Sequence, residues 1–339
     1  MRLTTRGKTV VGICVVAVLS AALYGPRALN AVVLPGALAL GAAYLQVRRT
    51  DAPRAIRTVP ADDHVGRGGE VTLRFADRDD HGPNPDVDRP FVGRVRDIVG
   101  EGLSSDATSV ETVVGTEPVT YEVTYEERGQ QTVGPAELTA RDVLGLVERE
   151  LTATGRDEVL AYPPLRAIAP WARRDLRALH ETGIHEERSE FDRLREYTEG
   201  DSLRDIHWVS TAKQDELIVK EFAAEAETEA VTMAAGAAVG SADEMAEAVA
   251  SVAVALLEDG VPVEVRLPGG AVTAGPERGS RVRLLERLAT VGSGRLPDTD
   301  ADLVVFADDE TTITLADRET TFTEMTEDRT PRYHHTTTE

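Results

Sequence analysis

Two uncharged apolar runs near the N-terminus constrain this chain more than any other feature of its sequence. The first, VVGICVVAVLSAALY, extends from Val10 to Tyr24, and the second, AVVLPGALALGAAYLQV, extends from Ala31 to Val47. Each is close to the roughly 20 apolar residues that a membrane-spanning helix requires, and the short segment GPRALN separates them. We therefore predict a two-helix transmembrane hairpin within residues 1–50, which places the chain in contact with membrane lipid.

A cleaved secretory signal is the alternative explanation for the first run. It accounts for Arg2, Arg6 and Lys8, but it leaves the second run without a role. The connecting turn carries only Arg27, whereas further basic residues follow the second run: Arg48, Arg49, Arg54 and Arg57. The positive-inside rule then predicts a two-pass protein of the cell membrane, with both termini and the soluble domains in the cytoplasm.

The overall composition narrows the kinds of partner and site that the chain can have. Its 339 residues suit more than one domain, and a net charge of −22 with only three lysines, Lys8, Lys213 and Lys220, indicates a salt-adapted organism. Binding a polyanion requires a concentrated basic patch, so we predict no nucleic-acid partner. Cys14 is the only cysteine and lies in an apolar run, which excludes disulfides and thiolate metal sites.

Alternating apolar and polar residues predict a β-rich domain over residues 60–165. Val71, Leu73 and Phe75 alternate with polar residues, and the segment from Val119 to Tyr125 repeats the pattern. This period of two is typical of half-buried strands. The spacing of these strands favours an antiparallel β-sandwich-like domain.

Strand and helix patterns alternate over residues 223–325. The expected order is strand 230–235, helix 242–259, strand 261–267, helix 281–291 and strand 302–307. Such alternation predicts a parallel sheet with flanking helices, as in Rossmann-type α/β modules. The polar tail over residues 326–339 is expected to be disordered.

A dense charged stretch, LREYTEGDSLRDIHW, lies in the intervening region of residues 166–222. Asp201 or Ser202 can cap a helix that extends to about Lys213, and a strand is expected over residues 216–222. Helical spacing places several polar and aromatic side chains on one face. The candidate interaction or structural residues are Arg195, Tyr197, Gly200, Asp201, Arg204, His207, Trp208 and Lys213.

Four interpretations of this stretch are open. His207 with Asp201 or Asp205 could act as a base, with Arg204 as an anion clamp, but no nucleophile motif accompanies them. A metal site that uses His185, Glu186 and His207 lacks any familiar ligand spacing. The two remaining interpretations are an interdomain clasp of arginine–carboxylate pairs and a protein-binding surface. We therefore predict no catalytic residue, no metal and no cofactor.

The sequence resembles proteins of the domain-of-unknown-function family 58 (DUF58). The residues that carry the resemblance are Phe191, Leu194–Tyr197, Gly200–Asp201, Arg204, Ile206, Trp208, Ala212–Lys213, Leu217, Val219 and Phe222, together with Arg128–Gly129, Gly134–Pro135 and Asp142–Leu146. The resemblance implies a membrane hairpin, a sandwich-like region and a von Willebrand factor A-like module in a haloarchaeal protein. It also implies a non-enzymatic scaffold or adaptor that acts with a MoxR-type AAA+ ATPase. The alternative is an uncharacterised hydrolase or metal-dependent binding protein centred on His207, Asp201 and Arg204.

The von Willebrand A-like module that the resemblance implies lacks the expected metal-binding oxygens. Family members that bind a metal carry Asp-x-Ser-x-Ser after the first strand of this module, and Ala234, Gly236 and Ala238 occupy those positions here. Divalent cations such as Mg²⁺ require oxygen ligands. The resemblance therefore implies a degenerate, truncated module without a metal.

Overall fold

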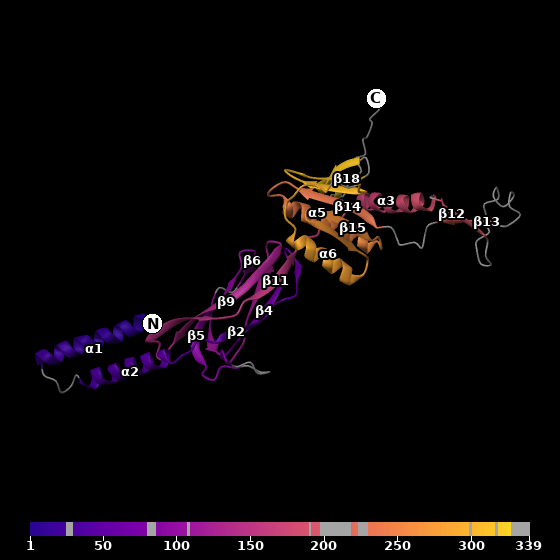
Figure 1. Cartoon of the computed structure of the whole chain (residues 1–339). Coiled ribbons are helices and arrows are strands. Elements are labelled where there is room, and N and C mark those ends of the chain that lie inside the picture. Colours follow the sequence, from indigo (N-terminus) through magenta and orange to yellow (C-terminus); the bar gives the residue numbers. More distant parts are fainter. Residues whose placement is uncertain are drawn as a thin grey trace, which may run out of the picture. The chain divides into compact units, whose positions relative to one another are not determined.

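The computed structural model divides the chain into two compact units, Met1–Ala161 and Tyr162–Glu339 (Figure 1). The structure describes residues 1–24, 30–79, 86–106, 109–189, 191–196, 218–222, 230–297, 300–315 and 318–326. The first unit contains two helices and an all-β domain, and the second contains a mixed α/β sheet. The units meet between Ala161 and Tyr162. The β-rich domain predicted from the sequence ends a few residues later, at residue 165.

The two apolar runs of the sequence form the helices α1 (Thr5–Tyr24) and α2 (Asn30–Arg48). Within α1, the segment Thr5–Ala22 is long and apolar enough to cross a membrane, and α2 contains a shorter apolar segment, Val32–Arg48. The helices contact each other: an added Cβ at Gly36 of α2 would lie 2.5 Å from the sulfur of Cys14 in α1. Two adjacent apolar helices therefore precede the β domain.

The β domain consists of two antiparallel sheets. The first follows the order β1-β10-β9-β11-β3, with β5 between β9 and β7, and the second follows the order β2-β4-β8-β6. The strands of the first sheet are β1 (Arg2–Leu3), β3 (Asp63–His64), β5 (Phe91–Val99), β7 (Val110–Val114), β9 (Gly129–Arg141), β10 (Val147–Ala153) and β11 (Asp157–Tyr162). Those of the second are β2 (Arg54–Thr58), β4 (Gly68–Ala76), β6 (Leu103–Ser105) and β8 (Val119–Tyr125).

The apolar positions of both sheets form a shared core, so the alternating strands predicted from the sequence are confirmed. One cluster joins Leu73 and Phe75 of β4 with Val95 of β5 and Leu138 of β9. The domain also uses residues that precede the expected start at residue 60, because β1 and β2 pair with β10 and β4. The two-residue strand β1 is too short for any alternation to be recognised in the sequence.

The second unit is built on a six-stranded sheet in the order β16-β15-β14-β17-β18-β19. The central strands β14 (Val231–Ala237), β15 (Val263–Leu267) and β17 (Leu303–Ala307) are parallel, as predicted. Three antiparallel strands that the alternation did not predict extend the edges of the sheet: β16 (Gly270–Ala274), β18 (Thr311–Leu315) and β19 (Arg318–Thr321). Gly269 and Gly270, with φ of 90° and 140°, permit the tight turn from β15 to β16.

Four helices accompany this sheet in the described part of the second unit. They are α3 (Pro170–Ser189), α5 (Ala242–Glu258), α6 (Arg278–Thr290) and α7 (Phe322–Thr326). The helix α5 is buried along most of its length, including Met245, Val249 and Leu256. The strands β12 (Phe191–Glu196) and β13 (Ile218–Phe222) form a separate antiparallel pair.

Candidate functional site

The predicted motif lies almost entirely outside the described residues. Arg195 is the exception: it belongs to β12 and is paired in register with Val219 of β13. The other seven candidates, Tyr197, Gly200, Asp201, Arg204, His207, Trp208 and Lys213, fall outside the part of the chain that the structure describes. Their grouping on one face of a helix therefore stays a prediction.

The described residues contain a different site, where the helices α1 and α2 join the β domain. Its centre is a turn that Asp142 holds in place. One carboxylate oxygen of Asp142 accepts hydrogen bonds from the backbone N–H groups of Leu146 and Val147, both at 2.7 Å, and the other accepts one from Leu144 at 2.8 Å. Gly145 completes the turn with a φ of 66°, a left-handed conformation that favours glycine.

This turn binds the first turn of α1. The backbone N–H of Thr4 donates to the carbonyl of Leu146 at 3.0 Å, and the Thr4 hydroxyl donates to the carbonyl of Gly145 at 2.5 Å. The same hydroxyl accepts a hydrogen bond from the N–H of Gly7 at 3.1 Å, which caps the helix. The approach is so close that a Cβ on Gly7 would collide with the carbonyl oxygen of Leu146. Thr4 is therefore both the helix cap and the link to the β domain.

The end of α2 is held at the same place. Arg149 of β10 donates to the carbonyl of Thr50 at 3.0 Å and to that of Arg48 at 3.3 Å, which satisfies backbone groups at the C-terminal end of the helix. An apolar cluster surrounds these bonds and consists of Ala43, Val47, Leu146 and Val147, with Val10, Ala39 and Leu40 packed against it. We call this set of contacts the junction. It comprises Thr4 and Gly7 of the α1 start, the turn Asp142–Val147, Arg149 of β10 and Val47 of α2.

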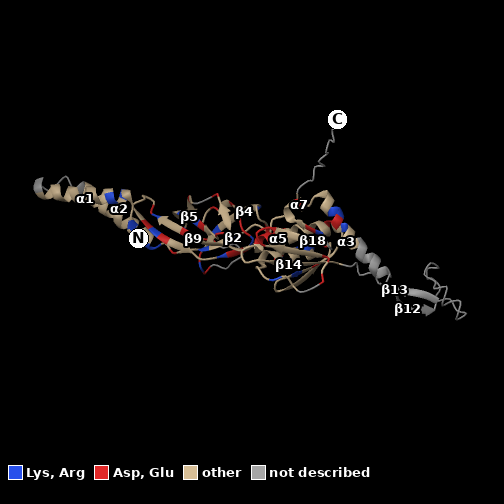
Figure 2. Ribbon diagram, turned by 90° about the horizontal axis from the view of Figure 1, so that it is seen from above, with Lys and Arg blue, Asp and Glu red and all other residues tan. Residues whose placement is uncertain are grey.

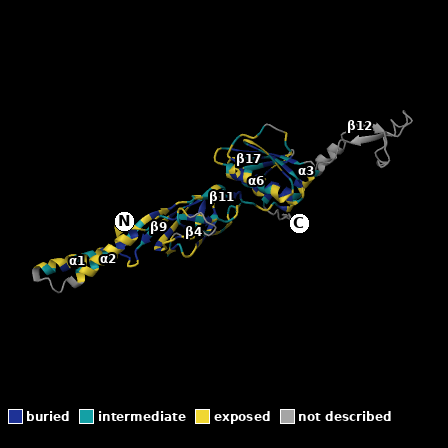
Figure 3. Ribbon diagram, turned by 60° about the horizontal axis from the view of Figure 1, so that its bottom comes forward, coloured by how far each residue is buried: buried dark blue, intermediate teal, exposed yellow. Residues whose placement is uncertain are grey.

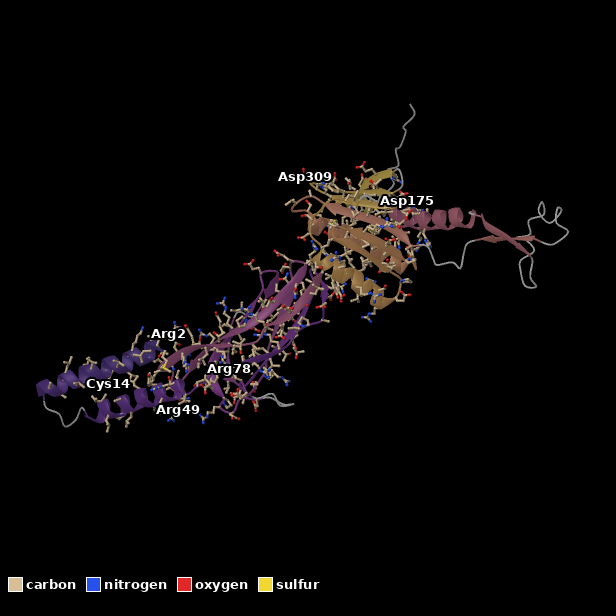
Figure 4. The ribbon with its side chains drawn as sticks, viewed as in Figure 1. Arg2, Cys14, Arg49, Arg78, Asp175 and Asp309 are labelled. Carbon is tan, nitrogen blue, oxygen red and sulfur yellow. The ribbon has the colours of Figure 1, made fainter. Side chains whose placement is uncertain are left out.

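Beyond the junction, both helices expose apolar side chains. The large exposed ones are Ile13, Val15, Val16, Val18, Leu19, Val32, Leu34, Leu38, Tyr44 and Leu45. Figure 3 shows exposed positions along both helices, and Figure 2 shows the charged residues of this unit on the β domain and at the helix ends that adjoin it. In Figure 4, Arg2 and Arg49 lie near that end, whereas Cys14 lies farther along α1. Most of the exposed apolar side chains of the helices thus lie away from the β domain.

A second cluster of polar side chains is buried inside the β domain. Arg57 donates from Nε and Nη2 to the two carboxylate oxygens of Asp97, both at 2.7 Å, and from Nη1 to the carbonyl of Gly155 at 2.9 Å. The hydroxyl of Tyr121 donates to Asp97 at 2.7 Å. The side chains of Arg57 and Asp97 are 0% and 3% exposed. The assignment of Arg57 to the basic residues beside the membrane is wrong, because its guanidinium lies in the core.

Burial and charge shift the pKa values in this cluster. Burial by itself lowers the pKa of Arg57, but the hydrogen bonds and the charge of Asp97 outweigh it and raise that pKa, so the guanidinium remains protonated. Burial of the phenol, together with the adjacent Asp97 carboxylate, raises the pKa of Tyr121 well above its ordinary value. Tyr121 therefore stays a neutral hydrogen-bond donor, and the three side chains link the two sheets.

The carboxyl end of β14 is the position at which the resemblance implied a lost metal site. Ala234 is fully buried, and a Cβ on Gly236 would lie 2.7 Å from the backbone nitrogen of Leu296. The N–H of Ala238 donates to the carbonyl of Ala307 at 2.8 Å. Backbone from residues 294–296 therefore fills the space next to Gly236. Among the described residues, no group of three or more histidine, cysteine, aspartate or glutamate side chains could hold a metal ion.

Neither the junction nor the Arg57 cluster was predicted from the sequence. The partner of the turn at Asp142–Leu146 is Thr4, far away in the sequence. The helix α1 begins at Thr5, five residues before the apolar run that starts at Val10, so the apolar run by itself does not identify Thr4 as the cap. No local pattern distinguishes Arg57 from the neighbouring basic residues, because its burial depends on the pairing of the two sheets.

Comparison with solved structures shows only low similarity. The chain is 20% identical to the PKD domain of an M14-like peptidase from a Thermoplasmatales archaeon, covering 33% of this chain and 96% of that one, with a TM-score of 0.20. It is 14% identical to a cohesin module from a Clostridium perfringens family 33 glycoside hydrolase, covering 33% and 98%, with a TM-score of 0.22. Values this low do not show a shared fold. No curated protein matches the sequence.

The remaining comparison concerns the region around the charged motif and the first part of the α/β sheet. Residues 193–300 match the family described as "Protein of unknown function DUF58". The match begins in β12, includes every candidate motif residue, and extends past α6. This is the family that the sequence resembles, and the match supports the assignment of the chain to the DUF58 family.

Proposed function

We propose that this protein is a membrane-anchored, non-enzymatic scaffold. In this proposal α1 and α2 form a two-pass transmembrane hairpin, and both soluble units lie in the cytoplasm. The observation that carries the proposal is the junction, where a folded β domain holds the ends of two helices that expose large apolar side chains. Removing one such side chain from water is worth about 1.5–3 kcal/mol, so ten of them strongly favour a bilayer over water.

The scaffold acts through protein–protein contacts with a MoxR-type AAA+ ATPase. Support for this part comes from the family resemblance and from the match over residues 193–300. The contact surface that we propose includes Arg204, His207 and Trp208, since arginine and tryptophan are the residue types that dominate binding energy at interfaces. The second unit is then a von Willebrand A-like module without a metal. The acidic, lysine-poor composition suits the cytoplasm of a haloarchaeon.

Reporter fusions test the anchor and its orientation. A reporter enzyme that is active only outside the cytoplasm is fused after Glu339, and in a second chain it is inserted between residues 26 and 27. We expect the first fusion to be silent and the second to be active, because the hairpin returns the chain to the cytoplasm. An active fusion after Glu339 would overturn the proposed orientation.

Co-purification tests the partner. The full-length protein is extracted from membranes in mild detergent and at high salt, and the bound proteins are identified by mass spectrometry. We expect an AAA+ ATPase with the wild type and much less of it with Arg204→Ala. The matched control is Arg94→Ala, which removes an exposed arginine of the β domain whose partner is Glu111. Equal recovery of the same proteins with all three chains would refute the proposed surface.

A further inference from the structure

The turn at the junction exposes two consecutive aliphatic side chains. Val143 is 77% exposed and Leu144 is 55% exposed, although they lie between Asp142 and Leu146, which are both buried. The backbone on either side is fixed by the three hydrogen bonds to the Asp142 carboxylate and by one from Gly145 N–H to the carbonyl of Asp142 at 2.9 Å. The exposure therefore belongs to a fixed turn and not to a loose loop.

The position of the turn relates it to the start of α1. The carbonyl groups of Gly145 and Leu146 accept hydrogen bonds from Thr4, so the turn lies beside the first turn of the helix. Leu3, which is paired with Val147, adds a third exposed aliphatic side chain there. The Arg6 guanidinium lies close to Gly145. Aliphatic side chains interspersed with basic ones, at the end of an apolar helix, are typical of a segment at the membrane–water interface.

The hydrogen bonding of the turn suits the same environment. A backbone N–H that loses water without finding another partner costs free energy, and this cost is largest near hydrocarbon. The N–H groups of Leu144, Leu146 and Val147 all have carboxylate partners, and that of Gly145 has a carbonyl partner. Asp142 itself is only 2% exposed. The turn can therefore approach lipid without leaving these groups unpaired.

We propose that Val143 and Leu144 insert into the boundary between head groups and acyl chains, in the leaflet where α1 begins. The inference rests on the proposed membrane anchoring. A lipid surface is the occupant because the exposed pair lies beside the first turn of α1, where Arg6 and Lys8 precede the apolar run. The helix has 20 residues and is thus about 30 Å long, so an α1 that spans the hydrocarbon places this charged first turn at the interface. The junction then fixes the depth and orientation of the β domain against the membrane.

Site-specific fluorescence tests this inference in the full-length protein. Cys14→Ala removes the only cysteine, and single cysteines are then introduced as Val143→Cys, Glu127→Cys or Val16→Cys. Each is labelled with an environment-sensitive fluorophore and reconstituted in vesicles of phosphatidylcholine and phosphatidylglycerol that contain spin-labelled lipid. Glu127 is exposed and lies next to the other end of β9, a 13-residue strand roughly 40 Å long that ends at Arg141. Val16 is 62% exposed on α1.

We expect the emission maximum of the label at position 143 to shift to the blue. We also expect lipid that is spin-labelled near the head group to quench most of this emission. The label at position 127 should show neither effect. If position 143 behaves like position 127 while position 16 is quenched by deep spin labels, the anchor holds and this inference is overturned. If position 16 also remains unquenched, the proposed anchoring fails and the inference fails with it. A blue shift at 143 without quenching would mean that protein covers the pair, which also overturns the inference.

Discussion

The guanidinium of Arg57 in β2 forms two parallel hydrogen bonds with the carboxylate of Asp97 in β5, and this pair joins the two sheets of the β domain. Both side chains are almost completely buried. Arg57 also donates to the carbonyl of Gly155 and to the carboxylate of Asp157, and Asp97 accepts from the hydroxyl of Tyr121, so the buried charges are compensated. A buried pair of this kind is costly to break, since the remaining partner is left as an uncompensated charge.

We therefore expect Arg57→Met to lower the free energy of unfolding of the β domain by about 3–5 kcal/mol, because it leaves Asp97 buried without its partner. The double variant Arg57→Met with Asp97→Leu should lose less, since it removes both charges. Hydrogen exchange of peptides from β2 and β5 in the purified full-length chain measures the effect. The matched control is Arg94→Ala, which breaks an exposed pair with Glu111 and should cost at most about 1 kcal/mol. Equal effects of Arg57→Met and Arg94→Ala would contradict the prediction.

Gly134 should tolerate no side chain, because the Arg57 cluster occupies the adjacent space. Its φ is 102°, and an added Cβ would lie 2.5 Å from the carbonyl oxygen of Gly155 and 2.8 Å from the guanidinium carbon of Arg57. We expect Gly134→Ala to destabilise the β domain by more than Gly66→Ala, whose φ is 82° but whose Cβ would meet no atom within 4 Å. The Gly66 variant should cost about 1–2 kcal/mol from backbone strain alone. Denaturant titration of both variants gives the comparison, and a smaller loss for Gly134→Ala would disprove it.

Asp259, at the C-terminal end of α5, should make the stability of the second unit depend on pH. Hydrogen bonds from Arg177 and Arg173 of α3 hold the pKa of Asp259 well below its ordinary range. A carboxylate with a lowered pKa stabilises the folded state above its unfolded pKa of about 3.9, and this contribution is lost as the pH falls toward the folded pKa. Asp259→Asn should therefore cost about 1–3 kcal/mol at pH 7. The difference from the wild type should shrink below about pH 4.

Urea unfolding of the wild type and of Asp259→Asn at a series of pH values measures this dependence. Asp175→Asn provides the control. Asp175 also lies in α3 and forms an ion pair with Arg318, but the side chains of Asp175 and Arg318 are 46% and 55% exposed. It should cost at most about 1 kcal/mol at pH 7. A constant difference between Asp259→Asn and the wild type down to pH 3 would show that the Asp259 charge does not contribute as described.

The helix α1 contains one glycine in a close contact, Gly7, and one in an open position, Gly12. A Cβ on Gly7 would collide with the carbonyl oxygen of Leu146, whereas a Cβ on Gly12 would meet no atom within 4 Å. Gly7→Ala should therefore weaken the junction by about 1–3 kcal/mol, the usual cost of overpacking. Gly12→Ala should be neutral or stabilising, because alanine favours the helix. Faster hydrogen exchange at Thr4 and Leu146 in Gly7→Ala, but not in Gly12→Ala, is the expected result, and unchanged exchange in both would contradict the close contact.

The sequence alone determined where several of the helices and some of the strands form. Uncharged runs and periods of two or 3.6 residues are local properties, so the positions of α1, α2, β4, β8, α5 and β17 follow from short windows of residues. The residues after the second apolar run show the limit of this approach. Arg49 and Arg57 look alike in the sequence, but only the pairing of β2 with β4 puts Arg57 into the core.

The tertiary structure decided how distant segments meet. Thr4 reaches Leu146 across 142 positions of the chain, and Arg57 reaches Asp97 across 40. Such contacts depend on which strands pair and in what register, and no local pattern records that choice. The edge strands β16, β18 and β19 were missed for a related reason: their few residues acquire a strand conformation by pairing with the neighbouring strand. The sequence therefore set the helices and strands, while long-range hydrogen bonds and burial set the junction and the buried ion pair.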